Sequence, residues 1–146
     1  AWSMGSTVAV ITDDAQREAA KLASMVIAPE LGADAVAGYI NTKAGIAQKM
    51  ILSMVATGLA IRTGRVYSNL RVDLEASNTK WVERQIAIVM EAGGCTRAVA
   101  KAALESCNNN CKTAVLMVLT GLDAWKAHEL LAQNNGFIRV ALQEAP

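Results

Sequence analysis

The sequence has little net charge, few cysteines and no basic-then-apolar pattern at its start. Its 14 basic and 13 acidic residues nearly cancel and are scattered along the chain. No positive patch for nucleic acid or anionic lipid is visible, so neither partner is expected. The start lacks the basic and then apolar pattern of a secretory leader, and the three cysteines are an odd number. Both features argue against a secreted disulfide framework and predict a cytoplasmic protein.

Long uninterrupted apolar runs are also missing. The longest, residues 50–61, is broken by Ser53, Thr57 and Gly58 and is preceded by Lys49. A membrane-spanning helix needs roughly 20 apolar residues, so no membrane segment is expected.

The common catalytic motifs are absent as well. The sequence has no nucleophile elbow, no phosphate-binding Gly-rich loop of Walker or Rossmann form, and no His-Glu metal helix. No catalytic residue, metal or cofactor is therefore predicted from motifs. Carboxylates suited to acid-base chemistry are isolated on predicted helix faces or in a connector, which favours structural charges over catalysis. They are Asp73, Glu75, Glu83 and Glu91.

The three cysteines and the histidine are the right number and type of residues for a zinc site, but their spacing is not. Cys107 and Cys111 are four residues apart, and Cys95 with the sole histidine, His128, would complete four ligands. The spacing between these residues matches no standard zinc module, so ordinary thiols are favoured. His128 would also suit a general base, but a solvated residue on an amphipathic helix is the better interpretation.

What the chain does have is enough apolar residues for a core. With 146 residues, 53% of them hydrophobic, it accommodates one domain or a small domain with a helical appendage. Residues 7–11 predict a buried strand, residues 15–24 a helix capped by Asp13 or Asp14, and residues 25–28 a second strand. This β-α-β order predicts a parallel sheet. Two strands do not make a stable sheet, so further strands are expected from a missing amino-terminal portion.

The remainder of the chain reads as helical. Residues 43–64 are apolar around most of a helix, which predicts a buried central helix or a subunit interface. Residues 66–76 predict an irregular connector. A compact bundle of short helices is then expected, over residues 79–92, from Thr96 to residue 106, over 111–120 after Asn110, from Asp123 to residue 133, and over 137–142.

The strongest candidate site lies where a loop meets the long apolar helix. Residues 30–42 follow a predicted strand, and ligands of open α/β sheets bind beyond the carboxyl ends of strands. Gly38 supplies flexibility, Asn41 or the following threonine caps the helix, and Lys43 falls in its first turn. A cation at a helix N-terminus is unfavourable without an anion. We therefore predict phosphate or sugar binding by Gly38, Asn41 and Lys43, with a solvated lysine as the equally weighted alternative.

Several runs, in order and with compatible spacing from about Val8 onward, resemble the N-acetylmuramic acid 6-phosphate etherase family. Glucokinase regulatory proteins are its non-enzymatic relatives. The runs are residues 43–50 (KAGIAQKM), 57–58 (TG), 64–73 (GRVYSNLRVD), 76–78 (ASN), 84 and 88–92 (R and IVMEA), 112–117 (KTAVLM), 121–124 (GLDA) and 135–139 (NGFIR).

The resemblance implies an α/β fold. Residues 1–76 would form the carboxyl-terminal part of a sugar-isomerase (SIS) domain, an αβα sandwich with parallel strands, and residues 77–146 a helical module that includes a three-helix bundle similar to a ubiquitin-associated (UBA) domain. It also implies a cytoplasmic homodimer that cleaves the lactyl ether of N-acetylmuramic acid 6-phosphate during cell-wall recycling. The products are N-acetylglucosamine 6-phosphate and D-lactate. The reaction is an elimination followed by water addition, with glutamates as acid and base and no metal.

Two departures from the family pattern shape the functional hypotheses. The family's catalytic glutamates and serine-rich phosphate loops belong to an amino-terminal half without a counterpart here. In addition, the family's Gly-Ser-Thr/Ser-Arg-x-Lys loop reads GYINTK at residues 38–43, which lacks the planar two-pronged arginine. The main hypothesis is the carboxyl-terminal half of an etherase, inactive alone. The alternatives are a sugar-phosphate-binding regulator of the glucokinase-regulator type and, more weakly, a helical module that docks peptides.

Overall fold

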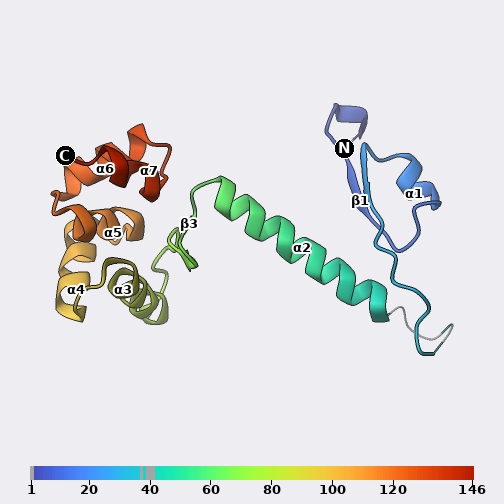
Figure 1. The fold of residues 1–146 in the computed structure, drawn as a ribbon, viewed down its shortest axis with the longest axis horizontal. Coiled ribbons are helices and arrows are strands. Elements are labelled where there is room, and N and C mark those ends of the chain that lie inside the picture. Colours follow the sequence, from blue (N-terminus) through green and yellow to red (C-terminus); the bar gives the residue numbers. More distant parts are fainter. Residues whose placement is uncertain (1, 37, 39–41) are drawn as a thin grey trace. The chain divides into compact units, whose positions relative to one another are not determined.

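The structure is a computed structural model that describes residues 2–36, 38 and 42–146 (Figure 1). It is a mixed α/β chain, mostly helical, with a short parallel sheet. The chain divides into two compact units, residues 1–57 and 58–146. The division at residue 76 that the family resemblance implies stays a prediction.

The first unit contains the predicted β-α-β arrangement. After a 3-10 turn at Trp2–Met4, strand β1 (Ala9–Ile11) pairs in parallel with β2 (Met25–Ile27), and helix α1 (Glu18–Lys21) lies between them in the sequence. The parallel pairing is confirmed. Helix α1 is shorter than expected because the Asp14 carboxylate accepts a hydrogen bond from the Gln16 amide at 2.8 Å. This contact holds residues 14–16 in a turn instead of the first turn of a helix.

Helix α2 (Thr42–Arg62) is long, and almost every residue along it is apolar or small. None of its described residues is buried, so the expected burial of this helix is not found within this chain. By length and composition alone it is also the one helix among the described residues that is able to cross a membrane. The residues that the structure describes therefore leave its apolar side chains at least partly exposed.

A small hairpin follows α2, where an irregular connector was expected. Strands β3 (Val66–Tyr67) and β4 (Leu70–Arg71) pair antiparallel, with Val66 opposite Arg71. Ser68, in the two-residue turn, has a φ of 55°, as the turns that match the twist of a hairpin require. The connector prediction was wrong at these residues, because strands of two residues leave almost no alternating pattern to detect.

The second unit is the predicted helical bundle, and its helices begin and end where the capping residues indicated. They are α3 (Thr79–Gly93), α4 (Arg97–Ser106), α5 (Cys111–Thr120), α6 (Ala124–Gln133) and α7 (Ile138–Glu144). The side chains of Asn78, Thr96, Asn110 and Asp123 each accept a hydrogen bond from an amide in the first turn. Each such cap contributes about 1 kcal/mol.

Helix α5 is the centre of this bundle. It contacts α3, α4, α6 and α7 (Figure 1), and residues 113–116 are all buried. Gly93 of α3 permits close packing against α5, because a Cβ atom on Gly93 would lie 2.5 Å from Val118 Cγ1. Tyr67 and Leu70 of the hairpin pack against the same core. Residues 58–146 thus have a hydrophobic core of their own.

Candidate functional site

The predicted site at the start of α2 is occupied by groups from the protein itself. The Lys43 amide donates a hydrogen bond to Asp34 Oδ1 at 3.2 Å. The Lys43 ammonium donates to the carbonyl oxygen of Leu31 at 3.3 Å and to that of Ala33. A carboxylate thus stands at the positive end of the helix, where anions are stabilised. Sequence reasoning missed Asp34, which is nine residues from its partner.

The other two predicted binding residues are less informative. Gly38 has a φ of 74°, in the left-handed region that favours glycine, and a Cβ atom there would meet nothing within 4 Å. Asn41 lies outside the described residues. Through its contacts with residues 31, 33 and 34, Lys43 lies against the loop that follows β2, as expected from the topology. Anion binding by Lys43 stays a prediction.

The cysteines are thiols in the bundle. Cys107 follows the end of α4 and Cys111 begins α5, so the two do not share one helix. Burial, followed by the nearby Cys107, raises the pKa of Cys111 to about 12. Burial also raises the pKa of Cys107, whose Sγ donates to the Asn110 carbonyl at 3.3 Å. Both thiols stay protonated near neutral pH and are poor nucleophiles. His128 is exposed on α6, as predicted.

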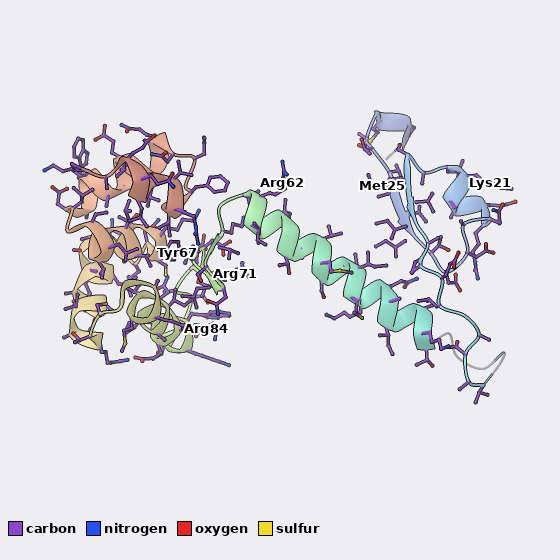
Figure 2. The ribbon with its side chains drawn as sticks, in the orientation of Figure 1. Lys21, Met25, Arg62, Tyr67, Arg71 and Arg84 are labelled. Atoms are coloured by element: carbon purple, nitrogen blue, oxygen red, sulfur yellow. The ribbon has the colours of Figure 1, made fainter. Side chains whose placement is uncertain are left out.

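The predicted structural role of the isolated carboxylates is supported for Asp73 and Glu83. Glu83 accepts a hydrogen bond from Arg97 at 2.7 Å, which lowers its pKa. Asp73 accepts a hydrogen bond from Arg71 at 2.7 Å and lies 3.7 Å from Arg65. Arg71 lies on the hairpin together with Tyr67 (Figure 2). Such ion pairs keep the carboxylates charged, which is unsuitable for a general acid.

Asp73 belongs to a polar groove that the sequence did not reveal. The groove, of about 490 Å³, lies between residues 72–76 and residues 108–112. Asp73 lines one side, and Lys112 lines the other, with its ammonium donating to the Gly136 carbonyl at 3.1 Å. Burial lowers the pKa of Lys112, while Asp73 acts in the opposite direction. The polar ends of both side chains are engaged within the protein, Asp73 with Arg65 and Arg71 near the hairpin and Lys112 with a carbonyl of the bundle.

Replacing Asp73 by asparagine is expected to lower the unfolding free energy at pH 7 by about 0.2–1 kcal/mol, because its arginine partners are largely exposed. Burial alone would raise the pKa of Asp73, but the hydrogen bond and charge of Arg71 and the charge of Arg65 lower it overall. The stabilisation is therefore present above the ordinary value of 3.8 and is lost as pH falls through the lower folded value.

Denaturant unfolding at pH 7 and pH 3 measures this difference. The difference in unfolding free energy between the parent and Asp73→Asn should be smaller at pH 3 than at pH 7. Glu75→Gln is the control, since Glu75 is exposed and has no ion pair in the described part of the chain. An equal loss at both pH values would contradict the ion-pair explanation.

Sequence comparison places the chain among curated proteins of known name. Over 142 residues it is 51% identical to the N-acetylmuramic acid 6-phosphate etherase of Klebsiella aerogenes, covering 97% of this chain and 47% of the relative. Over 144 residues it is 50% identical to the etherase of Aliivibrio fischeri (strain MJ11), covering 99% and 48%. The etherase of Edwardsiella ictaluri (strain 93-146) is 49% identical, with the same coverage.

The chain is a homologue of the carboxyl-terminal half of N-acetylmuramic acid 6-phosphate etherases. The resemblance predicted from the sequence runs is thus confirmed. The chain spans about half the length of the etherases that it matches. No protein-family model matches it.

Proposed function

We propose that this chain is the carboxyl-terminal half of an N-acetylmuramic acid 6-phosphate etherase. The observation that carries the proposal is about 50% identity to etherases over nearly the whole chain. The enzyme would be a carbon-oxygen lyase that acts on a phosphorylated amino sugar in peptidoglycan recycling.

The overall reaction consumes one water. Elimination removes a proton from the sugar ring and breaks the ether bond, which releases D-lactate. Water then adds to the unsaturated sugar and gives N-acetylglucosamine 6-phosphate. Both steps need a positioned acid and base. In this proposal, glutamates of an amino-terminal half supply the acid and the base, because Asp73 and Glu83 in this chain form ion pairs with arginines.

The part played by this chain is sugar-phosphate binding at the start of α2, through Gly38, Asn41 and Lys43. The α2 N-terminus and the Lys43 ammonium together suit a phosphate. Asp34 now accepts the amide hydrogen bond that a phosphate oxygen would take. A phosphate therefore has to displace the Asp34 carboxylate, since two anions repel one another at one helix end.

The same homology supports the finer fold and the assembly that we propose. The parallel β1–β2 pair suits the edge of an SIS αβα sandwich, and α4, α5 and α6 suit a UBA-like three-helix module. The complete protein would combine this chain with the amino-terminal half, form a homodimer and work in the cytoplasm without nucleic acid or a membrane as partner.

Release of D-lactate from N-acetylmuramic acid 6-phosphate tests the function. We expect none from the 146-residue chain alone. We expect release from a single polypeptide in which the amino-terminal half of the Klebsiella aerogenes relative precedes this chain. In that fusion, Lys43→Ala should raise KM about 10- to 100-fold, the effect of losing a charge-assisted contact. Lys21→Ala, which removes an exposed lysine of α1, is the matched control.

Three results would change the assignment. Lactate released by the 146-residue chain alone would show that the acid and base reside within it. A folded fusion that binds the sugar phosphate without releasing lactate would favour the regulator. A folded fusion that neither binds nor cleaves the sugar phosphate would refute the proposal.

A further inference from the structure

The helical bundle has another pocket, which we call the Trp125 pocket. It has a volume of about 400 Å³, within the range of small-molecule pockets. Ser106 at the end of α4 and Asn108 in the following loop line one part of it, and Trp125 and His128 of α6 line another. The buried Thr113 lines it from α5. All of these residues belong to the unit with its own core, so the bundle holds the walls of the pocket in place.

Trp125 gives this pocket an exposed aromatic surface. Its side chain is 70% exposed, whereas Ala127 and Leu131 on the same helix are buried in the core. His128 is three residues further along α6, so the imidazole and the indole share one side of the helix. Contact between the indole and water is costly, and a ligand that covers the ring removes this cost.

Hydrogen-bonding groups with unused capacity line the same pocket. Asn110 Oδ1 accepts hydrogen bonds from the Thr113 amide and hydroxyl, both at 3.0 Å, which leaves Asn110 Nδ2 to donate elsewhere. In the part of the chain that the structure describes, the side chains of Asn108, Trp125 and His128 make no hydrogen bond to another residue. The pocket therefore offers donors and acceptors beside an aromatic ring.

The lining carries no fixed charge. No aspartate, glutamate, lysine or arginine is among the described residues that line the Trp125 pocket. The charged residues nearby in the sequence pair with one another, Lys126 with Asp123 at 3.4 Å and Lys101 with Glu105 at 3.6 Å. A phosphate or carboxylate in the pocket would lack the cation that makes its hydrogen bonds strong. The pocket therefore suits an uncharged ligand.

A sugar ring combines the surfaces that this lining matches. One face of a pyranose presents C–H groups to an aromatic ring, and its hydroxyls both donate and accept hydrogen bonds. The free polar groups come from the loop after α4 and from α6, which suits hydroxyls that point in several directions better than the single hydrogen-bonding edge of a nucleobase.

We propose that the Trp125 pocket binds an uncharged saccharide. A C–H face of the sugar covers the Trp125 indole, and the hydroxyls bond to Asn108, Asn110 and His128. This site is additional to the sugar-phosphate site proposed at the start of α2. It is argued from the lining of the pocket alone and does not rest on the etherase assignment.

Titration of the 146-residue chain with N-acetylglucosamine, glucose and mannose, followed by NMR of the backbone and indole N–H groups, tests the proposal. We expect at least one sugar to bind with a roughly millimolar Kd, as for a single ring in an open pocket, and to shift the Trp125 indole signal. Trp125→Ala should weaken this binding by at least about tenfold through loss of the ring contact. His128→Ala should weaken it about fivefold.

Trp81→Ala is the matched control. Trp81 is 37% exposed on α3 and does not line the pocket, so its replacement should leave sugar binding at the parental level. Circular dichroism should show the parental helix content in all three variants, because each replaced side chain lies at the surface.

Several results would overturn the proposal. One is the absence of any shift at Trp125 and His128 with all three sugars at about 100 mM. Others are sugar binding that Trp125→Ala leaves intact, tighter binding of adenosine than of any sugar, and a homodimer that buries Trp125. None of these results bears on the etherase assignment, which lactate release by the fusion protein tests separately.

Discussion

Replacing Leu116 by alanine is expected to lower the unfolding free energy of the helical bundle by about 3 kcal/mol. Leu116 is fully buried on α5, the helix that contacts α3, α4, α6 and α7. Alanine removes apolar atoms from the core and leaves a cavity, and the four surrounding helices limit how far the site can collapse. Denaturant unfolding of the 146-residue chain, followed by circular dichroism, measures the loss.

Leu119→Ala is the matched control for this substitution. It makes the same chemical change on the same helix, but Leu119 is 36% exposed. We expect it to cost less than half as much as Leu116→Ala. Equal losses would show that α5 is not the centre of the core and that the two leucines share one environment.

The bundle was predictable because its signals are local. Thr96, Asn110 and Asp123 each cap a helix through a hydrogen bond to an amide three residues later. Gly94 and Gly121 end two helices in the left-handed conformation that glycine adopts readily. Each boundary is therefore set within one turn, and the expected and observed helices agree to within a residue or two.

The long helix shows where local reasoning stops. Its continuous apolar composition predicted burial, yet none of its described residues is buried in this chain. An apolar pattern indicates that a helix surface is suited to burial. It does not identify the residues that bury the surface, because these are distant in the sequence.

The candidate site at the start of α2 was likewise predictable only in part. Glycine, a helix start and a first-turn lysine were visible at positions 38, 42 and 43. The carbonyl oxygens that hold the Lys43 ammonium, and the Asp34 carboxylate on its amide, depend on the path of the preceding loop. No spacing rule places a loop carboxylate at a helix end nine residues later. The sequence thus indicated a glycine and a lysine near the start of the helix, but not the loop groups that contact Lys43.

Replacing Gln85 by glutamate is expected to cost about 3 kcal/mol at pH 7, because it places an unpaired charge in the core. Gln85 is fully buried on α3. Its Nε2 donates to the Leu74 carbonyl at 2.6 Å and to the Asn109 carbonyl at 3.0 Å. These bonds join the segment after the hairpin to the loop between α4 and α5. A carboxylate cannot donate to either carbonyl and would be repelled by both.

The pH dependence identifies this mechanism. Burial without a cation raises the pKa of the new carboxyl group in the folded protein above its unfolded value of about 4.3. The variant is therefore closest to the parent below that value and loses stability as pH rises through the folded pKa. Denaturant unfolding at pH 4 and pH 7 should show a larger deficit at pH 7. Gln133→Glu, exposed on α6, should stay within about 0.5 kcal/mol of the parent at both. A deficit in Gln85→Glu that does not change with pH would mean that lost packing, not the buried charge, is responsible.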